Sequence, residues 1–362
     1  MVDKKNTTVS IIVPTYHEVE NIPELIKQID GARVANNLSL ELLIMDDNSQ
    51  DGSVERVNSL NLPWVRIVVR TKDKGLSAAV LDGLRLAKND ILVVMDADLS
   101  HPPEKIPEMI KKINEGHDFV IGSRYVNGAS TDIGWGVFRW LNSKVATLLA
   151  RPLTSVKDPM SGFFALPRAV FEGADKLNPI GYKIGLELIV KCHCKNTAEV
   201  PIHFADRKFG QSKLSLKEQL NYIKHVRWLF IYKYEDLACL LQFGFVGLLG
   251  VLVNLAVLTL LLNVNIPAHF AVAVAIAVSI GTNFLLNRRF TFSYARRECP
   301  KKQFVGFVTS SSLAAVVNYL VTIGVMTIWF KGICPQLAAL VGILAGTIIN
   351  FFANRYVVFK KK

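Results

Sequence analysis

The chain has 362 residues, 51% of them hydrophobic, and its 42 lysines and arginines outnumber 30 aspartates and glutamates to give a net charge of +12. This length allows two domains, and long apolar runs dominate only after residue 236. No apolar signal-peptide segment stands at the N-terminus, which argues against secretion of the first domain. Because many basic residues flank apolar runs, a membrane surface explains the charge better than a nucleic acid does.

Four apolar segments in the first hundred residues alternate with helical stretches. They cover residues 9–13, 40–45, 65–69 and 91–95, and a helical pattern over 76–87 precedes the last of them. Apolar strands that alternate with helices predict a doubly wound α/β sheet. No G-x-G-x-x-G follows the first strand and the sequence has no P-loop, which argues against a dinucleotide dehydrogenase and a kinase.

Three of these four strands end in polar clusters, at residues 14–18, 46–51 and 96–100. Ligands of open α/β sheets bind beyond the carboxyl ends of strands, so we expect the clusters to converge on one crevice. The last cluster begins with Asp-Ala-Asp at 96–98, and two carboxylates so spaced can both reach one hard cation, which can hold a diphosphate. Two solvated acids in a loop give the same pattern, but the convergence of three clusters favours a nucleotide site.

Two stretches are amphipathic. In residues 214–234, apolar side chains recur at helical spacing against lysine and arginine, directly before the first long apolar run. This pattern predicts a helix lying on the membrane surface. Residues 137–149 are a second candidate, with Arg139 and Lys144 beside aromatic and aliphatic side chains. Packing against a protein core is the alternative for both, although the position of the first next to a span favours the membrane.

Four apolar segments are long enough to span a bilayer, which takes about 20 residues each. They cover roughly residues 237–262, 267–286, 304–330 and 335–352. Basic residues crowd the loop after the second segment and the tail after the fourth, whereas the two opposite turns share a single lysine. The positive-inside rule therefore places both chain ends in the cytoplasm.

The membrane part contains an internal duplication. Asn-Phe-Leu-Leu-Asn-Arg at 283–288 returns 67 residues later as Asn-Phe-Phe-Ala-Asn-Arg at 350–355, and Phe292 and Phe359 keep that offset. Each half is then a pair of spans in the same orientation, and we expect the halves to pack as similar hairpins about an axis normal to the membrane. Asparagines within the spans predict interhelical hydrogen bonds, with a path for lipid headgroups as the alternative.

Six motifs occur in order along the first 213 residues. They are Pro-Thr-Tyr-His-Glu at 14–18, Asp-Asp-Asn-Ser-Gln-Asp-Gly at 46–52, Asp-Ala-Asp-Leu-Ser-His-Pro-Pro-Glu at 96–104, Gly-Ser-Arg-Tyr at 122–125, Asp-Pro-Met-Ser-Gly-Phe-Phe at 158–164 and Asp-Arg-Lys-Phe-Gly-Gln-Ser-Lys at 206–213. The set resembles the family 2 glycosyltransferases of the glycosyltransferase-A fold, and more closely the dolichyl-phosphate mannose synthases. This resemblance covers about residues 8–235. The four spans are similar to the small four-helix GtrA-like proteins associated with polyprenyl-phosphate sugar transfer.

The resemblance implies a role for each matching position. The residues expected to line the nucleoside pocket are Pro14, Tyr16, Glu18, Met45 and Asp47. Those expected to meet ribose, diphosphate and metal are Asp96, Ala97 and Asp98. Ser100 stands where many members carry a glutamine metal ligand, and its shorter side chain leaves room for a water. Donor phosphates are expected at Arg124, Arg207 and Lys213, and the acceptor phosphate at Arg124, Arg139, Ser143 and Arg207. The catalytic set is then Asp98, Arg124, Arg139, Arg207 and Lys213.

The activity implied by the resemblance is inverting transfer of mannose from GDP-mannose to dolichyl or polyprenyl phosphate. It gives dolichyl β-D-mannosyl phosphate for protein glycosylation or glycolipid synthesis and uses Mg²⁺ or Mn²⁺. A phosphate acceptor is already nucleophilic at neutral pH, so no general base is needed, in keeping with the lack of an obvious His–Asp pair. Within the same class, UDP-glucose is an alternative donor. In another class, the chain would be a flippase of lipid-linked sugars whose cytosolic domain only binds.

These observations predict a cytosolic glycosyltransferase domain at 1–213, an amphipathic interface helix at 214–235 and a four-helix transmembrane domain of two duplicated hairpins at 236–362. The first is expected to be a Rossmann-like α/β domain on the cytoplasmic side, together with both termini. Membrane lipid is an expected partner and nucleic acid is not. The sequence does not indicate an oligomeric state.

Overall fold

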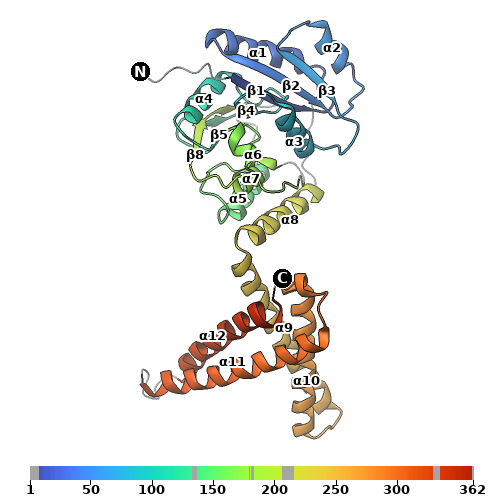
Figure 1. The fold of residues 1–362 in the computed structure, drawn as a ribbon, viewed down its shortest axis with the longest axis vertical. Coiled ribbons are helices and arrows are strands. Elements are labelled where there is room, and N and C mark those ends of the chain that lie inside the picture. The colour runs from blue at the N-terminus through green and yellow to red at the C-terminus, as the bar shows by residue number, and fades with distance from the viewer. Residues whose placement is uncertain are drawn as a thin grey trace. The chain divides into compact units, whose positions relative to one another are not determined.

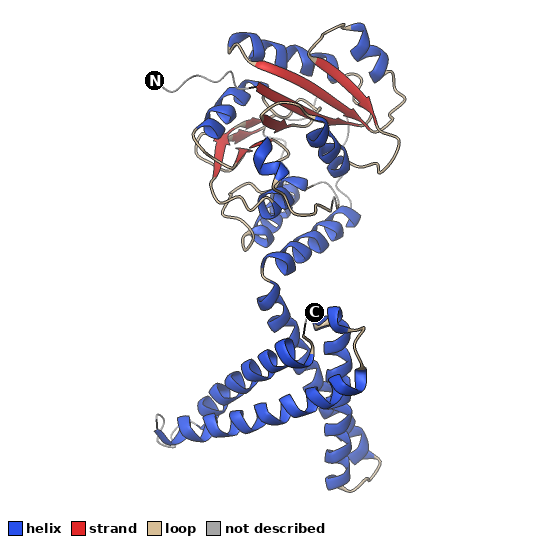
Figure 2. Ribbon diagram, in the orientation of Figure 1, coloured by secondary structure: helices blue, strands red, loops and turns tan. Residues whose placement is uncertain are grey.

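The computed structural model describes residues 8–132, 137–178, 180, 183–205, 216–328 and 335–360. The chain forms two compact units, Met1–Lys233 and Tyr234–Lys362 (Figure 1). We call the first the α/β unit and the second the helical unit. Helices and strands mix in the first, whereas the described elements of the second are all helical (Figure 2).

The α/β unit is built on a seven-stranded sheet of strand order β3-β2-β1-β4-β7-β5-β8. Its strands are β1 (Thr8–Thr15), β2 (Ser39–Asp46), β3 (Val65–Val69), β4 (Ile91–Val94), β5 (Phe119–Ser123), β7 (Phe164–Pro167) and β8 (Thr197–Pro201). Only β7 pairs antiparallel with its neighbours, β4 and β5. β6 (Ser130–Thr131) and β9 (His203–Phe204) form a separate parallel pair. The strands β1 to β4 confirm the doubly wound arrangement predicted from the sequence.

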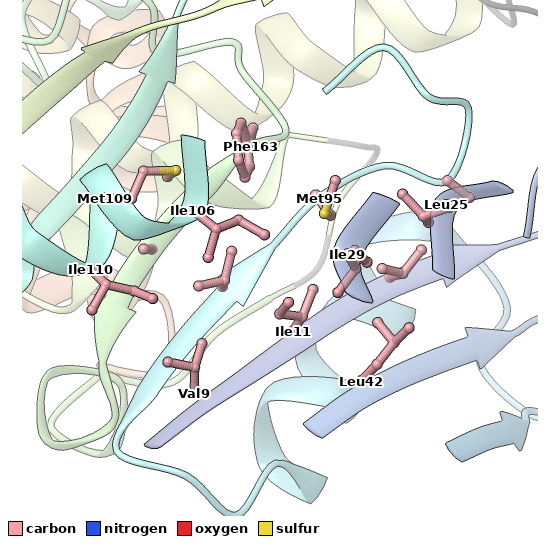
Figure 3. Packing of buried hydrophobic residues seen from close by; sticks show 14 of the residues in the cluster. Val9, Ile11, Leu25, Ile29, Leu42, Met95, Ile106, Met109, Ile110 and Phe163 are labelled. Carbon is pink, nitrogen blue, oxygen red and sulfur yellow. The ribbon is translucent and has the colours of Figure 1, made fainter. Parts of the chain in front are cut away.

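Helices cover both faces of the sheet because both sides of its central strands are apolar. Along β1, Ile11 and Val13 enter one core cluster and Ile12 enters the other. The first cluster is completed by α1 (Ile22–Ala35), α2 (Ser53–Ser59) and α4 (Ile106–Asn114) (Figure 3). The second is completed by α3 (Leu76–Leu86) and α7 (Ile184–Lys191). The remaining helices are η1 (Pro103–Lys105), α5 (Val137–Ala150), α6 (Arg168–Glu172) and α8 (Leu216–Lys233).

Helix α8 has two apolar faces rather than one. Leu220 and Ile223 are exposed, whereas Val226 and Leu229, which the sequence pattern grouped with them, are buried in the α/β unit. Between these two sets, His225 is 1% exposed and lies 3.2 Å from the carboxylate of Glu187 in α7. One side of the helix therefore packs on protein, and the other side carries the exposed apolar residues that a membrane helix needs.

Within the described residues of the helical unit, four helices are long and apolar enough to cross a membrane, as the sequence predicts. They are α9 (Glu235–Asn263), α10 (Ala268–Leu286), α11 (Pro300–Ile328) and α12 (Pro335–Ala353). Short helical turns follow the second and fourth of them, namely η2 (Asn287–Thr291), η3 (Ser293–Ala295) and η4 (Asn354–Val358). The amide of Asn350 in α12 donates to Ser311 Oγ in α11 over 3.4 Å, which is an interhelical hydrogen bond of the predicted kind.

The duplicated sequences fold alike. Each half ends in a π-helical turn, η2 or η4, and the Phe292 and Phe359 rings that follow these turns stack with centroids 4.7 Å apart. Arg288 Nε donates to Gln303 Oε1 over 2.8 Å. In the other half, 67 residues on, Arg355 Nε donates to Asp236 Oδ1 over 2.5 Å. Each arginine thus joins the end of its own half to the beginning of the other.

Candidate active site

Parallel pairing of β1 with β2 and with β4 brings the three polar clusters to one edge of the sheet. The Asp47 N–H donates to the carbonyl of Thr15 over 3.0 Å, and the Thr15 hydroxyl donates to Asp46 over 3.3 Å. The His17 N–H donates to Ser49 Oγ over 3.0 Å. The first two clusters are therefore joined by hydrogen bonds immediately beyond their strands.

The two aspartates at the end of β2 are both bound within the protein. Asp46 accepts the Ser49 N–H over 2.9 Å and the Ser49 hydroxyl over 2.5 Å. Asp47 pairs with buried Arg70 and accepts the Gly75 N–H over 2.7 Å. Gly75 has a φ of 135°, a conformation that favours glycine, and directly precedes α3. Asp47 thus fixes the start of α3 at the edge of the expected nucleoside pocket.

The other residues predicted for that pocket lie around the same strand ends. Pro14 and Met45 are buried, whereas Tyr16 is 46% exposed. Glu18 accepts a hydrogen bond from the Asn21 amide over 2.7 Å. A cavity of about 450 Å³ lies at the end of β2, lined by residues 46, 48, 50–55 and 69. None of the five predicted residues lines it, so the cavity adjoins the predicted pocket without coinciding with it.

The carboxylates of Asp96 and Asp98 follow the buried strand β4. Ser100 donates both its N–H, over 3.2 Å, and its hydroxyl, over 2.5 Å, to the same oxygen of Asp98. Asp98 is 6% exposed, whereas the side chain of Asp96 is 31% exposed. A Cβ at Gly162 would lie 3.0 Å from an Asp96 carboxylate oxygen. The glycine of the fifth motif therefore allows the backbone to approach the aspartate of the third.

A buried histidine ties this loop to its surroundings. The Asp96 N–H donates to Nδ1 of His101 over 3.0 Å, and the ring of His101 stacks on Phe163 with centroids 5.3 Å apart. Burial lowers the pKa of His101, and the charges of Arg124 and Lys183 lower it further, against the opposing effect of Asp96 and Asp98. Because Nδ1 of His101 accepts an N–H, that nitrogen carries no proton and the ring is neutral. The His101 ring lies 3.9 Å from an Asp96 carboxylate oxygen and 5.6 Å from the Phe204 ring.

Arg124 is held by a fully buried acid. Its Nε and Nη2 each donate to a different carboxylate oxygen of Asp158 over 2.8 Å, and its N–H donates to the same group over 3.0 Å. Burial alone would lower the pKa of Arg124, but the ion pair with Asp158 raises it overall. The guanidinium also lies over the rings of Tyr125 and Phe204, at 5.5 and 5.2 Å from their centroids. The site thus contains a cation in a fixed orientation.

Sequence reasoning missed two features of this arrangement. It assigned Arg124 to phosphate without recognising its partner, although an acid within an apolar motif such as 158–164 indicates a buried ion pair. It also missed Lys183, which donates to the carbonyl of Met160 over 2.7 Å and acts on His101. No motif contains this lysine, so the sequence carried no signal for it.

The remaining predicted residues are placed less completely. Ala97 is buried, and the Ser143 hydroxyl lies 2.6 Å from the Tyr125 hydroxyl. Arg139 belongs to α5, but its side chain lies outside the described part of the chain. Arg207 and Lys213 also lie outside the described residues. Of the residues predicted to bind phosphate, Arg124 and Ser143 are therefore the two whose side-chain contacts the structure describes.

The donor atoms at the end of β4 fit a hard divalent cation. Among the described residues no group of three or more His, Cys, Asp and Glu could hold a metal. The acids that follow β4 are Asp96 and Asp98. Mg²⁺ is commonly held by one or two carboxylates, with substrate phosphates and water completing its shell. Carboxylate and hydroxyl oxygens also suit Mn²⁺. The two aspartates, with the Ser100 hydroxyl beside Asp98, match that incomplete protein shell.

Comparison with known families agrees with this geometry. Residues 10–173 match the model of glycosyl transferase family 2, and residues 242–359 match that of the GtrA/DPMS transmembrane domain. The chain belongs to the family 2 glycosyltransferases and carries a GtrA/DPMS transmembrane domain, which makes it a membrane protein.

Individual relatives narrow the comparison. The dolichol-phosphate mannosyltransferase of Pyrococcus furiosus is 41% identical over 355 residues, which cover 96% of this chain and 98% of the relative. That of Saccharomyces cerevisiae is 42% identical over 235 residues, covering 62% of this chain and 88% of the relative. The crystal structure of mannosyl-3-phosphoglycerate synthase from Rubrobacter xylanophilus, 18% identical, superposes with a TM-score of 0.51 over 62% of this chain and 74% of that one. This last likeness supports the glycosyltransferase-A fold alone.

Proposed function

We propose that the protein transfers mannose from GDP-mannose to dolichyl phosphate or a related polyprenyl phosphate, with inversion at the anomeric carbon. The observation that carries this proposal is the convergence of Asp96, Asp98 and the fixed Arg124 beyond β4: His101 contacts Asp96, and its ring and the Arg124 guanidinium both lie against Phe204. Two acids for a cation and a rigid guanidinium are what a departing nucleoside diphosphate requires. The relatives named dolichol-phosphate mannosyltransferase support mannose and dolichyl phosphate as the transferred sugar and the acceptor.

Asp96 and Asp98, with Ser100 through a water, would hold Mg²⁺ or Mn²⁺, and the bound cation would offset negative charge on the nucleoside diphosphate. The Ser100 bonds fix one oxygen of Asp98, while the partial exposure of Asp96 leaves its carboxylate accessible to the crevice. The protein thus presents its two acids in a preformed arrangement, which avoids reorganisation during the reaction.

Arg124 acts in this proposal as an oriented charge. Asp158 engages Nε and Nη2 and holds the plane of the guanidinium, so a phosphate would be bound from the Nη1 side of the group. Arg139, Ser143 and Arg207 complete the proposed acceptor-phosphate site, and Lys213 joins Arg124 and Arg207 at the donor phosphates. The acceptor phosphate oxygen is already a nucleophile at neutral pH. A single displacement on an α-linked nucleotide sugar then gives a β-linked lipid phosphate without a general base.

The acceptor is a lipid, and the α/β unit carries exposed apolar side chains suited to a membrane surface. They are Val145, Leu148 and Leu149 in α5 and Leu220 and Ile223 in α8. We propose that these helices contact the cytoplasmic leaflet and that the active site and both termini face the cytoplasm, as the distribution of basic residues favours.

Turnover by the purified full-length protein tests the proposal. With dolichyl phosphate and Mg²⁺ or Mn²⁺, we expect a mannosyl phosphate lipid from GDP-mannose and none after chelation of the cation. Product from UDP-glucose in place of GDP-mannose would establish the alternative donor. Movement of lipid-linked sugar across vesicles without turnover of any nucleotide sugar would establish the flippase instead.

A further inference from the structure

A second cavity, of about 410 Å³, lies beside α5, and none of its lining residues is among those assigned above to the proposed reaction. It is lined by Tyr125, Lys144, Thr147, Leu148, Arg151 and Lys157. Three of these residues, Lys144, Thr147 and Leu148, belong to α5, and their spacing of three and four positions from residue 144 places them on one face of the helix. Arg151 directly follows the last residue of α5. The cavity is therefore a property of that face and of the two segments, at 125 and 157, that lie against it.

The residues that line this cavity include a threonine with a buried hydroxyl. Thr147 is 7% exposed, and its Oγ1 has no hydrogen-bond partner among the described residues. A threonine in a helix can normally satisfy its hydroxyl with a carbonyl of the preceding turn, as Thr259 does with Leu255 over 2.8 Å. Leaving such a buried group unpaired is unfavourable, because it loses its hydrogen bond to water without gaining another. Because Thr147 lines the cavity, its hydroxyl is the candidate donor to a ligand oxygen bound there.

The charge of the cavity selects an anion. None of its six lining residues is acidic, and three are basic. Two acids close to Lys157 in the chain or in space are engaged elsewhere: Glu199 accepts the N–H groups of residues 157 and 158 over 2.9 and 3.1 Å, and Asp158 pairs with Arg124. The Lys144 ammonium lies 4.7 Å from the centroid of the Tyr125 ring. Arg151 donates from Nη1 to the carbonyls of Ser155 and Val156 over 3.2 and 3.4 Å, which positions its guanidinium at the cavity.

The surroundings of the cavity identify the kind of anion. Leu148 lines the cavity and is 70% exposed, and Val145 and Leu149 beside it are 47% and 40% exposed. Apolar side chains around a cluster of cations suit a molecule whose phosphate is attached to hydrocarbon. A free nucleotide offers no such hydrocarbon. The chain is a membrane protein, so lipids with phosphate headgroups are at hand.

We propose that this cavity binds the phosphate group of a membrane lipid, with Thr147 as hydrogen-bond donor and Lys144, Arg151 and Lys157 as countercharges. The phosphate can come from an anionic phospholipid or from the polyprenyl phosphate acceptor. The acceptor source rests on the proposed function, whereas the phospholipid source requires only that α5 meets the membrane. In either case the site adds a lipid contact to the α/β unit itself.

Binding is measured with the full-length protein in zwitterionic micelles and without any sugar donor, so the result does not depend on turnover. The probes are dihexanoyl phosphatidylglycerol, geranyl phosphate and, as the neutral comparison, dihexanoyl phosphatidylcholine. Thr147→Val removes the hydroxyl and keeps the shape of the side chain. A triple variant, Lys144→Gln with Arg151→Gln and Lys157→Gln, removes the charges. The matched control, Lys27→Gln with Lys111→Gln and Lys195→Gln, removes three exposed lysines located elsewhere in the unit.

We expect the triple variant to bind one or both phosphate lipids roughly tenfold more weakly, Thr147→Val roughly threefold more weakly, and the control like the wild type. Weaker binding of phosphatidylglycerol alone identifies a phospholipid site, and weaker binding of geranyl phosphate alone identifies the acceptor. Unchanged affinity of both cavity variants for both lipids would overturn the proposal, as would an equal loss in the control. Because Thr147→Val is nearly isosteric, it decides the question even if the triple variant does not fold.

Discussion

The two units of the chain bury polar groups in different ways. The α/β unit buries charges in pairs, such as Arg70 with Asp47 and Arg124 with Asp158. In the described part of the helical unit the buried polar side chains are amides and hydroxyls, and the one buried charge is Arg355. Buried ion pairs add little stability, but they fix cations and carboxylates in position. This difference favours the α/β unit as the place of the chemistry and the helical unit as an anchor.

The largest expected effect is at the proposed cation ligands. Asp98→Ala should lower transfer roughly a thousandfold, since several kcal/mol of charge stabilisation would be lost at about 1.36 kcal/mol per tenfold. Folding should survive because the residue lies on a loop. The matched control is Asp90→Ala, an exposed acid at the other end of β4. Turnover close to that of the control, or full activity with a chelator present, would remove the metal role.

Separation of the units tests the comparison directly. A chain ending at Lys233, the boundary of the α/β unit, should bind GDP-mannose with an affinity close to that of the full-length protein. Transfer to long polyprenyl phosphate in membranes should fall strongly, and transfer to a short soluble analogue should fall less. Calorimetric titration and circular dichroism together decide the outcome. A folded fragment that does not bind the nucleotide sugar would place part of the donor site in the helical unit.

The fixed orientation of Arg124 can be tested without removing its charge. Arg124→Lys keeps a cation but loses the two parallel bonds to Asp158, so we expect turnover to fall about tenfold or more. Arg33→Lys offers a control in which a partly exposed arginine with an i, i+3 ion pair is changed. Steady-state kinetics with GDP-mannose should show the loss mainly in kcat. A change of less than about threefold would refute the role given to Arg124.

A smaller effect concerns stability and pH. Burial favours protonation of Glu187, but hydrogen bonds from His225, Lys191 and the N–H of Asn178 outweigh it and hold the pKa of Glu187 below its usual value. Because the pKa of Glu187 is lower in the folded protein than in the unfolded chain, its contribution to stability is fully present above the unfolded-state pKa, near 4.5. That contribution is lost as the pH falls through the folded-state pKa. Glu187→Gln should therefore cost about 1–3 kcal/mol at neutral pH and less at low pH. Denaturant titrations at several pH values measure this, and an equal cost at all pH values would contradict it.

The smallest effects are expected in the helical unit. Arg355 is buried and meets Asp236 and Glu235, whereas its counterpart Arg288 meets the neutral Gln303. Arg355→Met should therefore lower the unfolding temperature of the full-length protein more than Arg288→Met. Neither change should alter binding of GDP-mannose if the helical unit only anchors. Weaker donor binding in either variant would show that the comparison between the units is incomplete.

Local pattern explains what could be predicted from the sequence. The apolar runs before Asp46 and Asp96 identified β2 and β4, because a strand buried on both faces leaves a continuous apolar segment. The membrane helices were predictable for the same reason, and the repeat of Asn287-Arg288 as Asn354-Arg355 indicated the similar hairpins. These features require only residues close together in the chain.

The pairing of distant residues was not predictable in this way. The bond between Arg124 and Asp158, the lone hydroxyl of Thr147 and the packing of His225 on Glu187 depend on how separate elements meet. For the same reason, the sequence did not separate the apolar residues of α8 that pack on protein from those that are exposed. Periodicity shows that a helix face is apolar but not whether protein or lipid covers it. Roles assigned by resemblance to Asp47 and Arg124 stay predictions, since the structure shows the internal partners of both.

The central claim is that the α/β unit selects GDP-mannose and passes its mannose to a polyprenyl phosphate. Purified full-length protein is given dolichyl phosphate and Mg²⁺ with equal concentrations of UDP-glucose and of GDP-mannose carrying isotopically labelled mannose. We expect mass spectrometry to find labelled sugar alone on the lipid, nuclear magnetic resonance to show a β linkage, and Asp98→Ala to give no product. Unlabelled sugar on the lipid, an α linkage, or undiminished product from Asp98→Ala would contradict the account.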